Sequence, residues 1–168
     1  MNLYLLRHGL AAELTTAGLT KDSERPLTPK GRRKLRKIAA GMKALELKFD
    51  VILCSPYVRA RETAEIVAAA MRARKKIEFT AALTPGGSHS ELIKQINHSP
   101  DFQEVLLVGH EPHLSEFISL LVSGKSGLSV VMKKGGLCKL TIESLSCGRC
   151  AALEWLLTPG QMVLMAGE

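Results

Sequence analysis

The chain has 168 residues, a formal net charge of +7 and four cysteines, and its length suits one domain of ordinary size. A composition of 46% hydrophobic and 23% charged residues argues against disorder, and no apolar run approaches the ~18 residues of a membrane span. With one Trp, two Tyr and four Phe, the chain is poorly supplied for stacking nucleic-acid bases.

The predicted elements alternate between strand and helix from the first residues onward. A buried strand is expected at Asn2–Leu6, followed by a long polar loop at Gly9–Leu27. Thr28 and Pro29 are typical N-cap and first-turn residues, and they begin a helix that continues to about Leu45. The remaining predicted elements are a strand at Phe49–Cys54, a helix from Pro56 to about Ala73, a strand at Ile77–Leu83, a helix at Ser88–Ile96 with a capping box of Ser88 and Glu91, a strand at Glu104–Val108, a helix at Pro112–Val122, and a hairpin of Gly136–Glu143 and Cys150–Leu157.

Strands that alternate with helices predict an α/β fold with a mostly parallel sheet, here with a C-terminal β-hairpin. We find no repeats or linkers and therefore expect one domain over residues 1–168. The excess positive charge falls in two runs, which we interpret as solvated helix surface rather than a nucleic-acid site. These runs are Lys30, Arg32, Arg33, Lys34, Arg36 and Lys37, and then Arg72, Arg74, Lys75 and Lys76.

The N-terminus does not resemble a signal peptide, because the apolar run Leu3–Leu6 is short and ends at Arg7. We therefore expect a cytoplasmic protein without a membrane partner. The cysteines do not form a secreted disulfide framework, and Cys147 and Cys150 are expected to flank the turn of the hairpin. His110, Glu111 and His113 lack the HExxH spacing of a zinc enzyme, so no metal or other cofactor is expected, and His113 is interpreted as a helix-surface residue.

Ligands of parallel sheets bind at the carboxyl ends of the strands, where this chain places compatible side chains. Arg7 and His8 follow the first strand, Arg59 follows the second, and His110 follows the fourth. Two arginines at one point suit a phosphate, whose oxygens match the guanidinium fork. A histidine beside such a pocket can act as a nucleophile, and a second histidine can donate to a phosphate oxygen.

Four motifs carry a resemblance that covers nearly the whole chain. Leu6-Arg7-His8-Gly9 resembles the RHG signature of the histidine phosphatase superfamily, whose fold is phosphoglycerate mutase-like and three-layered. The segment from Ser55 to Ala64, the Leu27–Gly31 helix start and the Val108–Glu111 segment are similar to its other motifs. The compact length and the segments Arg25–Thr28 and Trp155–Pro159 resemble the phosphohistidine phosphatases of the SixA type.

This resemblance implies that His8 is the nucleophile and that Arg7, Arg59 and His110 complete the phosphate pocket. The carbonyl of Gly9 would orient the ring of His8. Many members of the superfamily place a glutamate after the third strand as general acid, and this chain has no carboxylate directly there. An imidazole leaves more readily than an alkoxide, so the missing acid suits a phosphohistidine substrate. Glu111 and His89 remain alternative proton donors. Each is equally compatible with a structural role, Glu111 as a carboxylate at a helix start and His89 as a loop residue.

The expected function is a metal-independent phosphohistidine phosphatase that acts on a phosphorylated protein, in a histidine phosphorelay type of signal transduction. The alternative within the same class is a phosphatase of small phosphate monoesters with Glu111 as acid. A phosphoglycerate mutase is less compatible with the short chain. In a different class, the protein could be a non-catalytic module that binds anions or nucleic acid through its basic helix.

Overall fold

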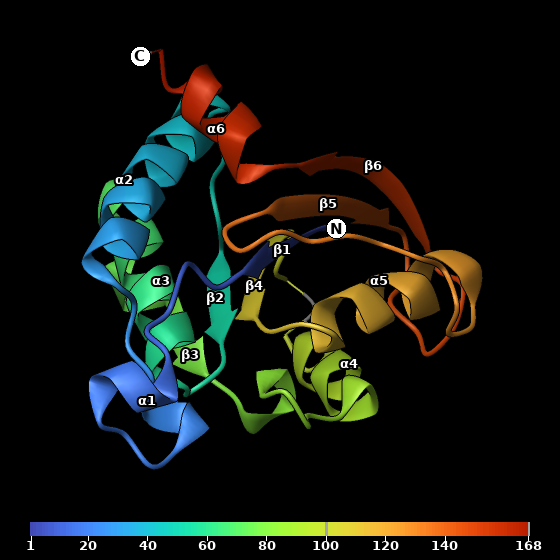
Figure 1. Cartoon of the computed structure of the whole chain (residues 1–168). Coiled ribbons are helices and arrows are strands. Elements are labelled where there is room, and N and C mark those ends of the chain that lie inside the picture. The colour runs from blue at the N-terminus through green and yellow to red at the C-terminus, as the bar shows by residue number, and fades with distance from the viewer. Residues whose placement is uncertain (100, 168) are drawn as a thin grey trace.

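Six strands form one sheet in the order β3-β2-β4-β1-β5-β6 (Figure 1). The computed structural model describes residues 1–99 and 101–167, without the side chains of residues 16 and 17. β1, β2, β3 and β4 are mutually parallel, whereas β5 pairs antiparallel with β1 and β6 antiparallel with β5. This confirms the mostly parallel sheet with a C-terminal hairpin. The strands are β1 (Asn2–Arg7), β2 (Val51–Cys54), β3 (Ile77–Phe79), β4 (Glu104–Gly109), β5 (Leu137–Ile142) and β6 (Ala151–Leu157).

Helices cover both faces of the sheet, so the fold has three layers (Figure 1). Alternate residues of β1 point to opposite faces. Leu3 and Leu5 pack with the helices α4 and α5, and Tyr4 and Leu6 pack with α2, α3 and α6. The helices are α1 (Leu14–Ala17), α2 (Pro29–Ala44), α3 (Val58–Ala70), α4 (His89–Asn97), α5 (His113–Ser123) and α6 (Pro159–Met165), with short 3₁₀ helices η1 (Asp22–Glu24), η2 (Arg74–Lys76) and η3 (Ala81–Leu83).

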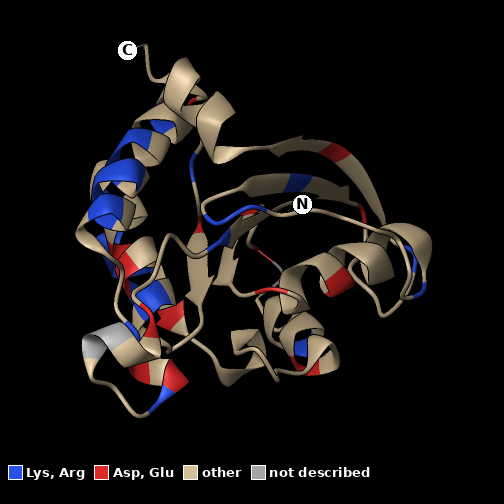
Figure 2. Ribbon diagram, in the orientation of Figure 1, with Lys and Arg blue, Asp and Glu red and all other residues tan. Residues whose placement is uncertain are grey.

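The start of α2 follows the sequence prediction closely. Thr28 caps the helix by accepting a hydrogen bond from the backbone N–H of Gly31, and Pro29 occupies the first turn. The apolar face buries Leu35, Ile38 and Met42. The basic residues lie along the exposed face of the helix, where Figure 2 shows Lys and Arg along most of its length. The prediction of a solvated basic surface is therefore confirmed for this run.

Three sequence predictions differ from the structure. The strand expected at Ile77–Leu83 ends at Phe79, because Thr80 caps the turn η3 and its N–H bonds to Cys54 O at the end of β2. The loop expected at Gly9–Leu27 contains α1 and η1. Ser88 caps α4 as predicted, but the carboxylate of Glu91 pairs with Lys94 at 2.8 Å, which is not the capping-box contact.

α6 is absent from the elements predicted from the sequence, although its start has the same chemistry as the start of α2. Thr158 and Gln161 form a complete capping box, and Pro159 occupies the first turn. Met162 is fully buried against α2, where the close approach leaves no room for a side chain at Gly41. The described residues include no helix that is long and apolar enough to cross a membrane.

Candidate active site

The segment after β1 is hydrogen-bonded on three sides, which fixes Arg7, His8 and Gly9. The N–H of His8 bonds to Gly109 O at 3.0 Å, and Arg7 N–H bonds to Gly136 O at 3.1 Å. The N–H of Gly9 donates to Thr63 Oγ1 of α3 at 3.1 Å. A Cβ on Gly9 would lie 2.5 Å from Leu35 Cδ1, so only glycine lets this segment pack against α2 at this distance.

Two hydrogen bonds determine the tautomer of His8. Its Nδ1 lies 2.7 Å from Gly9 O, and because a carbonyl oxygen can only accept, Nδ1 carries the proton. Arg59 Nε donates to His8 Nε2 at 3.2 Å, which places a lone pair on Nε2. Burial lowers the pKa of His8 to about 4, and the charges of Arg59 and Arg7 act in the same direction. His8 is therefore neutral at pH 7, with Nε2 available as a nucleophile.

Arg59 in the first turn of α3 connects His8 with the loop that follows β1. Its side chain is 6% exposed, and its two terminal nitrogens donate to Asp22 O at 2.6 Å and Asp22 Oδ2 at 2.8 Å. The guanidinium also lies over the ring of Tyr57, 5.2 Å from its centroid. Thr63 Oγ1 donates to Arg59 O at 2.7 Å, so one hydroxyl holds both Arg59 and Gly9.

His110 lies at the end of β4, with its ring centroid 5.1 Å from that of His8. Its Nε2 lies 2.8 Å from Ser55 Oγ, which also accepts a hydrogen bond from the N–H of Tyr57 at 3.3 Å. The hydroxyl of Ser55 thus contacts both the backbone after β2 and the ring of His110. Burial lowers the pKa of His110 to about 3, so this ring is also neutral at pH 7.

Arg7 completes a cluster in which polar groups lack partners. Its terminal Nη1 donates to Met132 O at 2.7 Å. Within the described residues, Arg7 Nε and His110 Nδ1 are buried and have no hydrogen-bond partner. A buried polar group without a partner costs about 1–3 kcal/mol; a bound oxyanion would remove that cost at Arg7 Nε, and also at His110 Nδ1 in the tautomer that carries its proton there. The structure therefore brings together the four residues predicted for the phosphate pocket: Arg7, His8, Arg59 and His110.

Asp22 is a site residue that sequence analysis did not identify. Besides Arg59, it pairs with Arg25 at 2.9 Å. Partial burial alone would raise the pKa of Asp22, but the hydrogen bonds from Arg25 and Arg59 outweigh it and hold the pKa below its ordinary value. The ionised carboxylate thus lies at the terminal nitrogens of Arg59, and the Nε of Arg59 faces His8. In the sequence, the sole indication of such a contact is the polar run Asp22–Arg25, which is followed by Pro26.

The two alternative proton donors occupy different positions. Glu111 Oε1 accepts a hydrogen bond from the N–H of Ser115 at 3.0 Å in the first turn of α5. The charge of Glu111 raises the pKa of Arg7, against the larger lowering caused by burial. His89 Nε2 lies 3.0 Å from His113 O, and its ring stacks on Phe117. The structure therefore places Glu111 beside the pocket and His89 in a separate contact with α5.

Two further sequence interpretations can be compared with the structure. His113 was expected on the helix surface and is 3% exposed, so that interpretation is wrong; burial lowers its pKa to about 4. Cys147 and Cys150 are free thiols between β5 and β6, as predicted. No group of three or more His, Cys, Asp or Glu side chains among the described residues could hold a metal ion.

Comparisons with known proteins agree with the motifs. Residues 3–84 match the model of the histidine phosphatase superfamily (branch 1). An uncharacterised protein of Picosynechococcus sp. is 38% identical over 140 residues, which cover 82% of each chain. The phosphohistidine phosphatase SixA of Escherichia coli is 28% identical over 128 residues, which cover 75% of this chain and 77% of that one.

Solved structures show the same fold. The protein histidine phosphatase SixA complexed with tungstate matches with a TM-score of 0.82 and 24% identity, over 95% of this chain and 98% of that chain. The α-ribazole phosphatase from Shigella flexneri matches with a TM-score of 0.66 and 19% identity, over 90% of this chain and 96% of that chain. The chain belongs to the histidine phosphatase superfamily, branch 1, is a phosphatase, and is similar to SixA in sequence and fold.

Proposed function

We propose that this protein is a phosphohistidine phosphatase that removes phosphate from a phosphorylated histidine of another protein through a covalent phospho-His8 intermediate. His8 is the nucleophile, Gly9 O orients its ring, and Arg7, Arg59 and His110 bind the phosphate. One observation carries this proposal: two buried nitrogens without partners, Arg7 Nε and His110 Nδ1, belong to the cluster around the lone pair of His8 Nε2.

In the first step, His8 Nε2 attacks phosphorus, and a new P–N bond forms as the P–N bond to the substrate histidine breaks. The electron pair of the broken bond returns to the substrate imidazole, which takes a proton from solvent. In the second step, water attacks phosphorus, the bond to His8 Nε2 breaks, and inorganic phosphate and neutral His8 are regenerated. Arg7 and Arg59 stabilise the negative charge of the phosphoryl oxygens in both steps.

The substrate class follows from the proton donors near the pocket. An alkoxide needs a positioned acid, whereas an imidazole leaves with less assistance. Asp22 is ionised because two arginines bind it, and Glu111 accepts a hydrogen bond from the start of α5. Neither carboxylate is arranged as a proton donor in this structure. The name of the E. coli relative, a phosphohistidine phosphatase, supports the same substrate class.

The test compares a phosphohistidine protein, phosphoramidate and a phosphate monoester as substrates of the purified enzyme. We expect the highest kcat/KM for the phosphohistidine protein and no measurable turnover by His8→Ala on any of the three. The Ser90→Ala variant changes an exposed residue of α4 and serves as the control for purification and storage; it should have wild-type turnover. Undiminished turnover by His8→Ala would contradict the assignment of the nucleophile.

A second candidate, a phosphatase of small phosphate monoesters, is favoured by the position of Glu111 close enough to Arg7 to raise its pKa. The similar fold of an α-ribazole phosphatase is compatible with this candidate. Glu111→Gln separates the two functions. A loss of activity confined to esters would support an acid role for Glu111. Wild-type activity of the variant on both esters and phosphoramidate would oppose that role.

Three further proposals concern the domain that carries the reaction, its partner and its location in the cell. Residues 1–168 act as one catalytic domain, because a single sheet with two packed core layers extends from Met1 to the hairpin and α6. The partner is a phosphorylated protein of a histidine phosphorelay. A cytoplasmic location suits the four free cysteines, since thiols stay reduced there.

A further inference from the structure

A cavity opens beside the catalytic loop and shares Gly9 with it. Its volume is about 220 Å³, and its wall includes Gly9 and Leu10 of the loop and the apolar side chains of Leu35 and Ile38. Three lysines, Lys30, Lys34 and Lys134, complete the lining. We call these three side chains the lysine triad. Gly9 is shared with the catalytic site, because its carbonyl oxygen accepts the hydrogen bond from His8.

The wall of this cavity is held in place by backbone contacts. Leu10 O accepts hydrogen bonds from Thr28 N–H at 2.9 Å and from Thr28 Oγ1 at 3.3 Å. A side chain at Gly31 would collide with the same carbonyl oxygen, so the loop and α2 lie in direct contact. Lys30 and Lys34 are one helical turn apart on α2 and face the cavity together. The cavity is therefore built before any ligand arrives.

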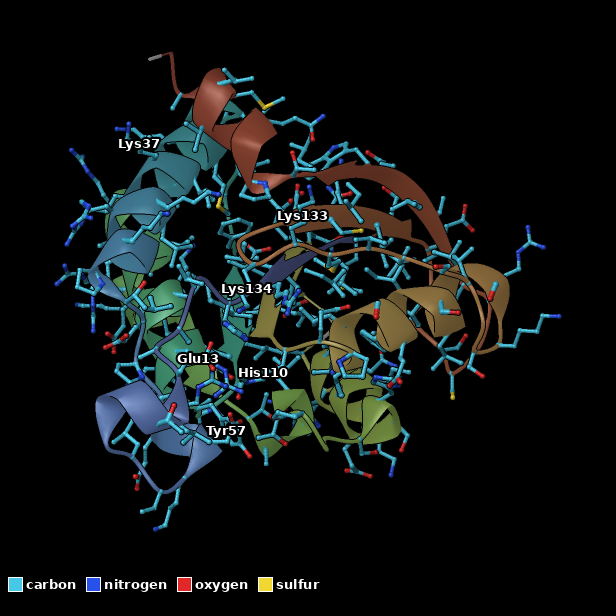
Figure 3. All side chains as sticks on the ribbon, viewed as in Figure 1. Glu13, Lys37, Tyr57, His110, Lys133 and Lys134 are labelled. Carbon is cyan, nitrogen blue, oxygen red and sulfur yellow. The ribbon has the colours of Figure 1, made fainter. Side chains whose placement is uncertain are left out.

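Lys134 lies in the segment that is bonded to the catalytic residues. On one side of it, Gly135 N–H donates to the carbonyl oxygens of Arg7 at 3.0 Å and His8 at 3.2 Å. On the other side, Met132 O accepts from Arg7. The charge of Lys134 contributes to the lowered pKa of His8, after burial and the two arginines. Figure 3 shows Lys134 and His110 in the same region of the molecule. A ligand of the lysine triad would thus lie next to the phosphoryl group.

The lysine triad gathers three basic side chains around one cavity without an acidic side chain in the lining. Arg32 pairs with Glu62 at 2.7 Å, and Lys139 pairs with Glu154 at 2.8 Å. No carboxylate lines the triad cavity, and no ion pair of the three lysines is found within the described residues. Three like charges around one cavity repel one another, and a bound anion would relieve that repulsion.

We propose that the lysine triad binds an acidic side chain of the phosphorylated partner protein while its phosphohistidine occupies the catalytic pocket. The carboxylate meets the three ammonium groups, and its methylene stem contacts Leu10, the exposed apolar residue of the lining. An inorganic phosphate would not make this apolar contact, so the cavity fits a side chain better. This proposal rests on the proposed function, and it predicts a preference for phosphohistidines with Asp or Glu nearby in the partner.

The experiment uses two phosphohistidine peptides that differ only in Glu or Gln at positions flanking the phosphohistidine. We expect wild-type enzyme to favour the Glu peptide by about tenfold in kcat/KM, through KM, and the preference to shrink with rising salt. Lys30→Gln/Lys34→Gln and, separately, Lys134→Gln should each bring the ratio of the two peptides towards one. Lys43→Gln/Lys48→Gln removes two charges, one in the last turn of α2 and one in the segment after it, and should leave the ratio unchanged.

The outcomes separate this proposal from the proposed function. Equal wild-type turnover of the two peptides, or a preference that survives the lysine substitutions, would overturn the triad site alone. If neither peptide were hydrolysed, the proposed function would fail. The triad would then be tested by inhibition of phosphoramidate turnover, which the unphosphorylated Glu peptide should produce more strongly than the Gln peptide. Stronger, triad-dependent inhibition by a small bisphosphate would assign the site to a second phosphate and contradict the protein side chain.

Discussion

A single buried hydroxyl, that of Thr63, connects the catalytic loop to α3. Its Oγ1 accepts from Gly9 N–H and donates to Arg59 O, and the residue is fully buried. Thr63→Val keeps the shape and removes the hydroxyl. Arg59 O still has its helical hydrogen bond, so the damage falls on Gly9 N–H, which is left buried without a partner.

Leaving such a donor unpaired costs about 1–3 kcal/mol, so Thr63→Val should lose about 2 kcal/mol of stability. For a domain of this size that loss corresponds to a decrease in Tm of roughly 4–8 °C. Activity should fall further than stability requires, because Gly9 O orients His8. Thr63→Ser, which keeps the hydroxyl, is the matched control and should retain most of the activity at a temperature where both variants are folded.

Thermal unfolding and phosphoramidate turnover of the two variants test this reasoning. If Thr63→Val had the stability and kcat of the wild type, the hydrogen bond to Gly9 would not matter. If Thr63→Ser were as damaged as Thr63→Val, the methyl group, and not the hydroxyl, would be responsible.

Three other predictions follow from the site. The free energy of unfolding should fall as pH decreases from about 6.5 towards 4, because the buried His8, His110 and His113 have lowered pKa values and take up protons in this range only in the unfolded chain. The slope should reach up to about 4 kcal/mol per pH unit, and His113→Gln should reduce it by about one third. Denaturant titrations at several pH values measure this slope. Ser55→Ala should lower kcat about tenfold with little change in KM, because His110 loses the partner of its Nε2; an unchanged kcat would show that Ser55 does not position the ring. Asp22→Asn should strengthen competitive inhibition by inorganic phosphate about fivefold, because the half-exposed ion pair with Arg59 contributes about 1 kcal/mol; weaker inhibition would mean that Asp22 holds Arg59 in its binding position.

Most residues of this site could be predicted from the sequence, because they come at or shortly after the carboxyl ends of the parallel strands. A buried strand followed by Arg7 and His8 can be recognised without tertiary information, and parallel strands place their carboxyl ends at one edge. Thr28 and Pro29 likewise mark a helix start through local chemistry alone. The same reasoning would have found α6, whose Thr158 and Pro159 repeat the pattern.

The rest depends on contacts between segments that are distant in sequence. Asp22 reaches Arg59, 37 positions away, because the loop after β1 folds over α3. His113 is buried because α5 packs over the start of α4, where its ring contacts that of His89, 24 positions earlier in the chain. The lysine triad joins one helix face to a residue that follows it by a hundred positions. Periodicity and spacing carry no information about such contacts.

The most direct test of the account is to trap the phosphorylated enzyme. The enzyme is mixed with excess phosphohistidine protein, denatured within milliseconds at alkaline pH, where P–N bonds survive, and digested for mass spectrometry. The account predicts phosphate on the peptide that contains His8, at the Nε2 position, and none in His8→Ala. Turnover without a phosphorylated enzyme, or with phosphate on His110 instead, would contradict it.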